Sequence, residues 1–536
     1  MQGTDGTDKG GEMNNNVERE FNLIMEPLIQ VRKGDEELRM SLPEVLEHLG
    51  RGTREIDFVH LRPFQHHAWY AFLVQLASMA LISSGENDPC RDAAEWTELL
   101  LGLTAEDEDP WCVYVKDLSK PAFMQPPVPE GQIVDRWNEI YTPGMLDLLV
   151  TSKNHDVKIQ LINSPAVDHW CYSLVSVQTM EGFLGRGNYG IVRMNGGFGS
   201  RPCVTFVRST EWGARFVRDV PILLAEYDNL LNSSLPYSGR DGHKLLWTFP
   251  WDGEGSIDIA ECDPYFIEVC RRIRLKRKEG SLTAFGISTS TSRVAGEELH
   301  GVTGDPWTPI DKIEGKALTI SSAGFTYQKL HQLLIGGEYM NPSTWRQRGE
   351  NGDMYLVASA LTRGQGKTEG YHHRELPVPQ PVLGMLETPE GRDRLAEMSE
   401  SRLQICQQVR NNLLNRALCV ITQGAPEGRL DFRDSKTRPW LSVLDREIDA
   451  IYFDRLFAQV ERNKEEADLE WTRELLELAE EQLEDAIESI PQPSLRRYRI
   501  ECAARRVFHG SARKAFPDLF KNGDDGTGMN GGETDD

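Results

Sequence analysis

The segment ELPVPQPVLG, Glu375–Gly384, divides the sequence into two parts of different character. It holds three prolines within five residues, a density that neither the interior of a helix nor a central strand tolerates. After it, apolar residues recur at the spacing of amphipathic helices. Before it, short β-rich runs alternate with helical segments and with many Gly and Pro turns. The segment is therefore predicted to separate two domains.

Four amphipathic segments follow this boundary, with apolar residues three or four positions apart, and the connections between them are short. Such a pattern predicts an antiparallel four-helix bundle over residues 386–520. The predicted core positions are Cys406, Val409, Leu413, Ala417 and Val420 in the first helix; Leu441, Leu444, Ile448, Tyr452, Leu456 and Val460 in the second, which Pro439 opens; Leu476, Ala479, Leu483, Ile487 and Ile490 in the third; and Leu495, Tyr498 and Cys502 in the fourth.

Residues 18–385 are predicted to form a large mixed α/β domain. Cys203–Ser209 (CVTFVRS) and Lys316–Gly324 (KALTISSAG) have the composition of strands, whereas Ala68–Ile82 is predicted to be a buried helix, too short and too polar to span a membrane. The fold class is therefore α+β, with the bundle at the C-terminal end. Residues 1–17 are expected to be a flexible leader, and the acidic residues 521–536 a disordered tail.

The formal net charge is −24, which argues against a protein that binds nucleic acid alone by bulk attraction. The run CRRIRLKRK, Cys270–Lys278, is an exception, with six basic residues in the eight that follow the cysteine. This run indicates either a solvated face or a contact with phosphate or RNA. The nine cysteines form no C-x-x-C pair, so free thiols in a cytoplasmic protein are expected, with neither a metal nor a cofactor.

Two glycine motifs suggest nucleotide chemistry. Gly185–Val192 (GRGNYGIV) matches the loop that covers ATP in protein kinases, but neither H-R-D nor D-F-G follows it. Arg363–Thr368 (RGQGKT) ends like a Walker A loop, yet the position of the first required glycine is Leu361. A nucleotide-dependent phosphotransferase that uses these loops stays the alternative hypothesis.

Two pairs of adjacent histidines, His66–His67 and His372–His373, are the remaining candidates for catalytic chemistry. Neighbouring side chains point in different directions in a helix or a strand, so a paired site is not favoured. One packed and one exposed histidine in each pair is the simpler expectation, although one member of each pair can still be functional.

What remains is a set of loops rich in Gly, Asn and basic residues, without a nucleophile or a metal. Such loops suit close approach of the backbone to a nucleic acid rather than bond cleavage. Arg201, in MNGGFGSRP, is a candidate phosphate contact. The loops span residues 151–158, 181–190, 195–202, 336–343 and 362–375.

The ordered set of motifs resembles the CasA family, the large subunit of the type I-E CRISPR surveillance complex Cascade. The resemblance covers residues 20 to 515 and rests on FNLIMEPLIQVRKGDEELRMSLPEVL, VTSKNHDVK, GGFGSRPCVTFVR, GDPWTP, IGGEYMNPS and RGQGKTEGYHHRELPVP, followed by the four helices.

The resemblance implies a non-catalytic protein that recognises the protospacer-adjacent motif in double-stranded DNA, helps to open the duplex for R-loop formation, and helps to recruit a helicase-nuclease. Its implied partners are the CRISPR guide RNA, the target DNA and the other Cascade subunits, namely the backbone, small and handle-binding subunits. No membrane is implied. Base pairing then reads most of the sequence while the protein reads a short flanking motif.

The resemblance also assigns roles to particular positions. The loop with Lys153, Asn154, His155 and Lys158 is similar to one that contacts the end of the guide RNA and the motif region. Gly182 matches a glycine whose backbone approaches the minor groove of the motif, where base reading is degenerate.

A second group of implied residues concerns opening of the duplex. Asn341, Pro342 and Ser343 match the turn that places a wedge at the first base pair to be opened. Relatives carry glutamine where this chain has Pro342, so either the register differs by one residue or proline acts as the wedge. Arg293 is the candidate basic contact to the motif. Some relatives hold zinc near the positions of Cys262–Cys270, but half of that cluster is missing, and no zinc is expected.

Overall fold

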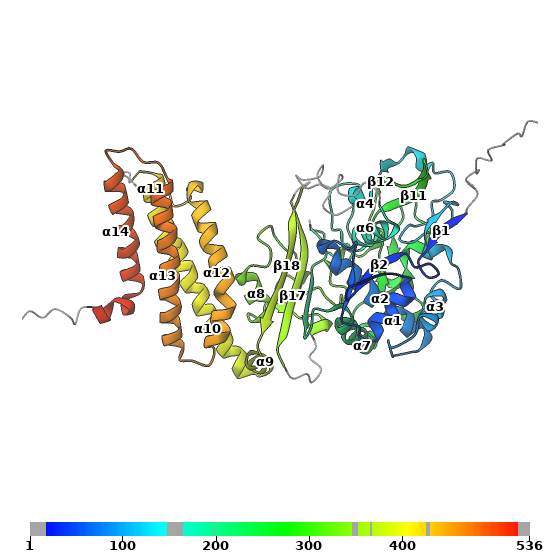
Figure 1. Cartoon of the computed structure of the whole chain (residues 1–536), viewed down its shortest axis with the longest axis horizontal. Coiled ribbons are helices and arrows are strands. Elements are labelled where there is room, and N and C mark those ends of the chain that lie inside the picture. The colour runs from blue at the N-terminus through cyan, green and yellow to red at the C-terminus, as the bar shows by residue number, and fades with distance from the viewer. Residues whose placement is uncertain are drawn as a thin grey trace, which may run out of the picture. The chain divides into compact units, whose positions relative to one another are not determined.

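The computed structural model describes residues 18–146, 165–197, 199–345, 352–364, 367–424 and 429–523. The chain divides into two compact units. The N-terminal unit comprises residues 1–325 and 338–377, and the helical unit comprises residues 326–337 and 378–536. The first contains both helices and sheets and the second contains helices (Figure 1), so the α+β fold class is confirmed.

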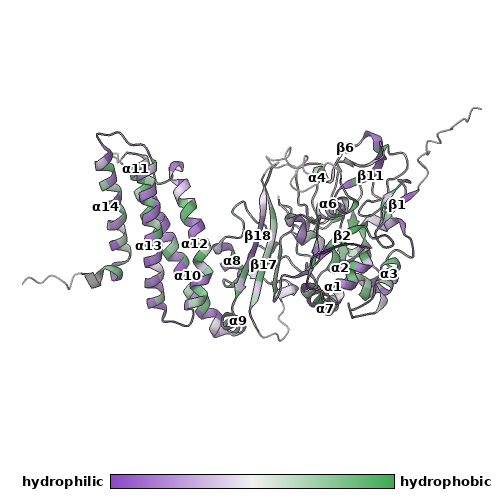
Figure 2. Ribbon diagram, viewed as in Figure 1, coloured by the Kyte–Doolittle hydropathy of each residue, from purple (hydrophilic) through white to green (hydrophobic). Residues whose placement is uncertain are grey.

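The core of the N-terminal unit is built around helix α2 (His66–Ser84), which is buried from residue 67 to residue 82, as predicted. Figure 2 colours this helix mostly hydrophobic, as expected for a helix surrounded by protein. The side chain of Gln75 donates to the main-chain oxygen of Tyr265 at 3.0 Å, which satisfies its buried amide. No helix in the described ranges is both long and apolar enough to cross a bilayer.

Helices of the N-terminal unit pack around α2, and the described strands form small sheets of two or three strands. Its other helices are α1 (Leu42–Gly50), α3 (Ala93–Gly102), α4 (Pro143–Leu146), α6 (Val167–Met180) and α7 (Trp212–Leu231). The three-stranded sheets, in spatial order, are β3 (Glu36–Met40), β2 (Ile29–Lys33) and β4 (Ile56–Phe58); β11 (Arg272–Lys278), β12 (Ser281–Ile287) and β6 (Asn138–Ile140); β15 (Lys316–Ala317), β14 (Ile310–Asp311) and β16 (Tyr339–Met340); and β18 (Lys367–Val378), β17 (Met354–Gly364) and β7 (Cys203–Val207). The two-stranded sheets are β1 (Arg19–Asn22) with β5 (Cys112–Val115), β10 (Cys262–Ile267) with β8 (His243–Leu245), and β13 (Val294–Ala295) with β9 (Ile257–Asp258).

The helical unit contains long helices packed side by side (Figure 1). A π-helical stretch, Gln408–Leu414, joins α10 to α11 in one continuous helical run. The predicted core positions of the first and second bundle helices are all buried. In the third helix Ala479, Leu483 and Ile487 are buried, whereas Leu476 and Ile490 are half-buried. The helices of this unit are α8 (Tyr327–Leu334), α9 (Gln380–Glu387), α10 (Pro389–Gln407), α11 (Asn415–Thr422), α12 (Arg438–Gln459), α13 (Lys464–Ser489) and α14 (Arg497–Ala515).

The predicted core of the fourth bundle helix was wrong. Leu495 is fully exposed, Tyr498 is 79% exposed and Cys502 is exposed. The buried face of α14 consists of Ile500, Ala504, Phe508 and Ala512. This stripe continues at a spacing of four residues along the helix, whereas Leu495 lies before the helix begins at Arg497. The face of α14 that packs against the other helices is therefore the one that carries this stripe.

Candidate nucleic-acid interface

A glycine-rich loop begins where α6 ends at Met180. The N–H of Gly182 donates to the main-chain oxygen of Gly199 at 2.9 Å, and the N–H of Ile191 donates to that of Glu181 at 2.9 Å. Residues 181–190 are thereby tied to the segment MNGGFGSRP, which the sequence places several residues downstream. The two glycine-rich stretches therefore form one folded feature.

Gly182 is buried inside this feature. A Cβ atom at this position would lie 2.6 Å from the main-chain oxygen of Gly197 and 2.8 Å from that of Gly199, closer than real Cβ atoms come. The close backbone approach that requires glycine here is thus made by the second glycine stretch of the same chain. A contact between Gly182 and DNA stays a prediction.

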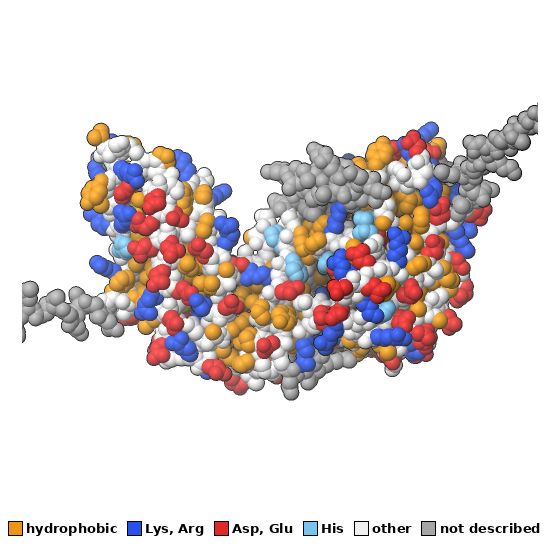
Figure 3. Space-filling view, in the orientation of Figure 1, with side chains coloured by type: hydrophobic (Ala, Val, Ile, Leu, Met, Phe, Trp, Pro, Cys, Tyr) orange, Lys and Arg blue, Asp and Glu red, His pale blue; other side chains and the backbone are white. Residues whose placement is uncertain are grey.

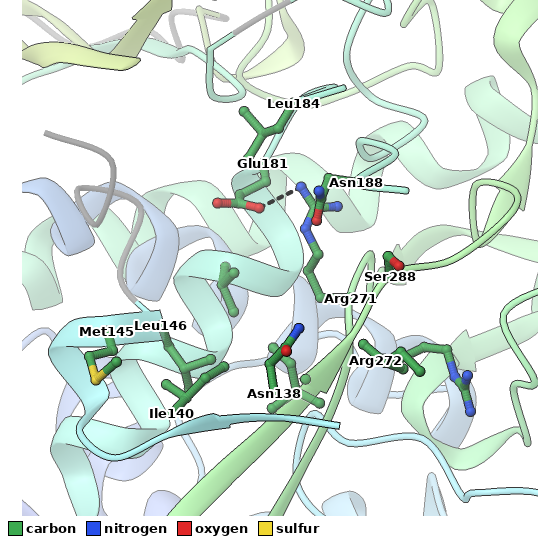
Figure 4. A pocket seen from close by; sticks show the side chains of 14 residues that line it. Asn138, Ile140, Met145, Leu146, Glu181, Leu184, Asn188, Arg271, Arg272 and Ser288 are labelled. Carbon is green, nitrogen blue, oxygen red and sulfur yellow. Dashed lines mark ion pairs between the residues drawn. The ribbon is translucent and has the colours of Figure 1, made fainter. Parts of the chain in front are cut away.

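A cavity of about 300 Å³ borders the loop (Figure 4). Arg271 reaches from the start of the β11 strand to form an ion pair with Glu181, so the loop is fastened to the sheet. Asn188 lies beside Arg271, and Asn138 and Ser288 add further polar groups to the lining. The cavity offers hydrogen-bonding groups, and its described lining residues include no Cys, Lys or His.

A second hollow of about 440 Å³ is also lined by the loop. Phe183 and Tyr189 line it with their ring centroids 5.9 Å apart, and Asn195 and His300 add polar groups. Aromatic rings at the edge of such a hollow can stack on bases, a contact that tolerates any base sequence.

The exposed cation of this loop is Arg186. It lies between Gly185 and Gly187, whose φ angles of 115° and 90° favour glycine and turn the chain outward at this point. Arg186 and Asn188 are exposed, and among the described residues no carboxylate lies within 4.0 Å of the Arg186 guanidinium. Arg186 was not predicted as a site residue, although a basic residue between two glycines was the available signal.

The basic run Cys270–Lys278 does not provide a free basic surface. Each of its basic side chains has a partner within the protein, and burial lowers the pKa of Arg274 to about 10. On the face drawn in Figure 3, Lys and Arg side chains of the N-terminal unit are interspersed with Asp and Glu. The partners are Glu181 for Arg271, Gln132 for Arg272, three main-chain oxygens for Arg274, Asp135 for Lys276, Glu20 for Arg277 and Glu139 for Lys278.

The proposed phosphate contact by Arg201 was wrong, because this side chain is buried. Its Nε lies 2.6 Å from a carboxylate oxygen of Asp305, and the same carboxylate is 3.6 Å from Arg193. The nearby guanidinium groups hold the pKa of Asp305 below its usual value despite its burial, which would otherwise raise it. The arginine that follows the glycines is therefore part of an internal ionic network.

Arg293, the candidate contact to the motif, is 3% exposed. Its guanidinium donates to the main-chain oxygens of Phe249 at 3.0 Å and Pro250 at 3.2 Å, and it lies 5.2 Å from the ring centroid of Trp251. These contacts hold the 246–251 segment in place. Reading of a motif by Arg293 stays a prediction, and the geometry gives it no support.

The turn predicted to carry the wedge is well anchored. Pro342 is buried, its main-chain oxygen accepts from the N–H of Trp345 at 3.0 Å, and the hydroxyl of Thr344 donates to Pro306 at 2.7 Å. Asn341 is exposed, and Met340, at the end of β16, is 48% exposed. The exposed side chains at this turn are therefore Met340 and Asn341; Met340 lies within the predicted loop 336–343, but the resemblance implies only the three residues after it.

Ser343, the third residue implied at this turn, begins a short 3-10 helix, Ser343–Trp345. The remaining predicted contacts, Lys153, Asn154, His155 and Lys158, lie outside the described residues. The chain leaves the described region after Leu146, which lines the cavity in Figure 4.

The glycine motifs lack the geometry of a nucleotide-binding loop. RGQGKT lies where strand β17 ends at Gly364 and strand β18 begins at Lys367, whereas a Walker A loop must open a helix. Residues 185–192 form turns rather than the strand pair of a kinase glycine-rich loop. The phosphotransferase alternative therefore receives no support from the fold.

Within the described ranges, one trio of side chains has ligand atoms close enough for a metal ion to bridge. These are His60, Asp168 and His169, whose candidate ligand atoms lie within 4.8 Å of one another. His60 and Asp168 are already 3.0 Å apart, and the same carboxylate accepts the N–H of Gln30 at 3.1 Å. His60 and Asp168 thus form a hydrogen-bonded pair at the start of α6, and the ring of His169 stacks on that of His60 with centroids 4.3 Å apart.

No protein-family model matches this sequence, and no curated protein matches it either. Solved structures match it in fold over nearly its whole length. CasA of Thermus thermophilus has a TM-score of 0.58 at 16% identity, covering 92% of this chain and 99% of its own. The CRISPR-associated protein Cse1 of Acidimicrobium ferrooxidans has a TM-score of 0.59 at 14% identity, covering 93% and 99%. Thermobifida fusca Cse1 has a TM-score of 0.58 at 12% identity, covering 93% and 98%.

Proposed function

We propose that this chain, which has the fold of the CasA and Cse1 proteins, is the large subunit of a type I-E CRISPR surveillance complex. In this role it recognises the protospacer-adjacent motif in double-stranded DNA, helps to open the duplex, and helps to recruit the helicase-nuclease. It does so without catalysing a reaction. The observation that carries the proposal is the likeness of fold to CasA and Cse1 along almost the entire chain.

The geometry of the glycine loop supports contact with a nucleic-acid backbone. The loop presents the exposed side chains of Arg186 and Asn188 on a frame that the Glu181–Arg271 ion pair holds rigid. Half-buried Phe183 and Tyr189 lie beside them. We assign phosphate binding to Arg186, since its guanidinium has no carboxylate partner among the described residues and so breaks no ion pair there when it binds phosphate.

We assign the role of the wedge to Met340 and Asn341 rather than to Pro342. A wedge must insert between base pairs, and a buried proline is not available for that, whereas an exposed methionine is among the apolar side chains that other proteins insert. Pairing of β16 with β14 before this turn and hydrogen bonds after it hold the main chain that carries the two side chains. Pro342 then supplies the rigid base of the turn.

The charge balance agrees with a subunit that does not bind DNA strongly alone. A net charge of −24 repels the phosphate backbone at long range, and four of the six basic side chains in the densest basic run are paired with carboxylates. The subunit therefore depends on its partners for affinity and confines its own contribution to short loops.

The test is reconstitution of the complex with guide RNA, followed by affinity measurements on duplexes with and without the flanking motif. Equal affinities for the two duplexes would contradict the proposal. Arg186→Gln should weaken binding to both duplexes equally, and it should reduce the slope of log K against log salt concentration by about one. Arg240→Gln, which changes an exposed arginine elsewhere on the N-terminal unit, is the matched control.

Duplex opening is tested separately with a fluorescent base analogue beside the motif. Met340→Ala or Asn341→Ala should slow the rise in fluorescence, whereas Met25→Ala, another exposed methionine, should not. Wild-type opening rates in both Met340→Ala and Asn341→Ala would show that the wedge lies elsewhere.

A further inference from the structure

Three of the four histidines in the adjacent pairs line one cavity of about 330 Å³. His66 and His67 begin helix α2, and His373 lies on strand β18, so segments far apart in the sequence meet here. His372 faces the hydroxyl of Thr362 instead, at 3.1 Å. The two histidine pairs, which the proposed function does not use, are thus joined at a single site in the N-terminal unit.

Among the described residues, several polar atoms at this cavity have no hydrogen-bond partner. His67 is 7% exposed, and both of its ring nitrogens lack such a partner. The same holds for the hydroxyl of Thr205 and the Nε of Arg215. Buried polar groups are nearly always paired with protein, with water or with a bound ion, because leaving them unpaired is costly. All three residues line the same cavity.

One wall of the cavity has two features that favour an anion. Arg215 has no carboxylate within 4.0 Å among the described residues, and its guanidinium lies 4.0 Å from the ring centroid of Tyr70. Thr210 and Trp212 place the start of the long helix α7 at the same wall, and Glu211 gives this helix no side-chain cap. Unpaired N–H groups and the positive end of a helix both favour an anion.

The acidic group at the cavity is already engaged. Glu375 is 3.1 Å from Nε2 of His373, whose Nδ1 is 2.9 Å from the hydroxyl of Ser359. This chain of contacts fixes the orientation of His373 and leaves Glu375 directed at an internal partner. Tyr371 stacks on His67 at a centroid distance of 5.9 Å and fixes that ring as well.

We propose that this cavity binds a small oxyanion of the phosphate type, held by His67, Thr205 and Arg215. A hydroxyl, a guanidinium and a neutral imidazole N–H are all donors to phosphate oxygens. The volume lies at the lower end of small-ligand pockets, which suits a single phosphate group. The group can be a free ion or a phosphate at the end of a nucleic acid, since both present the same oxygens.

The full chain is tested by thermal unfolding during a titration with inorganic phosphate at constant ionic strength, with chloride as the replacement. Phosphate should raise Tm saturably by about 2 °C or more. Thr205→Val and Arg215→Gln should abolish or strongly reduce this rise. Thr303→Val is the matched control, because the buried Thr303 hydroxyl is also unpaired but does not line the cavity.

Without phosphate, both valine variants should raise Tm slightly, since each removes an unpaired buried hydroxyl. This keeps the test informative about binding rather than folding. The proposal is overturned if phosphate has no saturable effect on the wild-type chain, or if Thr205→Val responds to phosphate as Thr303→Val does. Such a failure leaves the proposed role in the CRISPR complex untouched.

A second titration identifies the source of the phosphate. A short single-stranded RNA with a 5′-phosphate is compared with the same RNA ending in a 5′-hydroxyl, each in competition with inorganic phosphate. Competition by the phosphorylated RNA alone supports a nucleic-acid terminus as the ligand. No competition by either RNA, with inorganic phosphate still bound, supports a free ion.

Discussion

Replacement of Gly182 by alanine separates two explanations for this glycine. The resemblance to CasA implies that its backbone approaches DNA. The structure shows instead that it is buried against the main-chain oxygens of Gly197 and Gly199. If the internal contact requires the glycine, Gly182→Ala should destabilise the protein before any DNA is added.

The size of the effect follows from the two distances. A Cβ atom would lie 2.6 and 2.8 Å from the oxygens of Gly197 and Gly199, and ordinary contact begins at 3.4 Å, so these oxygens must move by about 0.6–0.8 Å. The Gly199 oxygen cannot move freely, because it also accepts the N–H of Gly182 at 2.9 Å. Overpacking of this kind costs about 1–3 kcal/mol. The lower entropy of the unfolded chain offsets about 0.4–1 kcal/mol, so the expected net loss is about 1.3 kcal/mol at the midpoints of the two ranges and about 2.6 kcal/mol at most.

The assay is urea unfolding followed by tryptophan fluorescence, with the midpoint and slope compared between variants. Gly102→Ala is the control, because nothing lies within 4 Å of the new methyl group at this exposed position near the end of α3. It should be neutral or slightly stabilising. A Gly182→Ala protein that unfolds like Gly102→Ala but loses motif recognition in the assembled complex would refute the packing explanation.

Two further predictions concern stability alone. Burial raises the pKa of Glu268 from 4.5 to about 7, so between these pH values the folded protein keeps a proton that the unfolded chain has released. The free energy of unfolding should therefore fall by up to about 3 kcal/mol as the pH rises from about 4.5 to 7. Glu268→Gln should make the urea midpoint less dependent on pH over this range. In α14, Phe508→Ala should cost about 3–5 kcal/mol because Phe508 is buried, whereas Tyr498→Ala should change stability by less than about 0.5 kcal/mol; equal losses in thermal unfolding would contradict the assigned face.

The sequence was informative wherever burial depends on a local repeat. The helix over Ala68–Ile82 follows from a nearly continuous apolar run, and the core positions of the first two bundle helices follow from the helical spacing of apolar residues. The repeat failed in α14, where two apolar stripes share one helix and their relative packing decides between them. Local spacing cannot rank two stripes, because the deciding surface belongs to other helices.

Basic residues were harder to assign, since their roles depend on partners that are distant in the sequence. Arg271 pairs with Glu181 and Arg201 pairs with Asp305, and in each case the partner lies on a different segment of the chain. A basic residue with a buried partner and one that is free to bind phosphate have the same sequence signature. Arg186 differs from Arg271 and Arg201 in that no carboxylate among the described residues pairs with it. The local sequence does not reveal this difference.

The glycines illustrate how the two kinds of inference combine. A glycine cluster correctly predicts that something approaches the backbone closely, but it does not say whether that neighbour is a ligand or another part of the chain. At Gly182 the neighbour is the chain itself, and the loop folded in this way exposes Arg186 and Asn188. If the loop contacts DNA, the role of the glycines is to set the conformation of the loop. The contact itself is then made by the side chains that this conformation exposes. Recognition should therefore be more sensitive to Arg186→Gln than stability is, and the reverse should hold for Gly182→Ala.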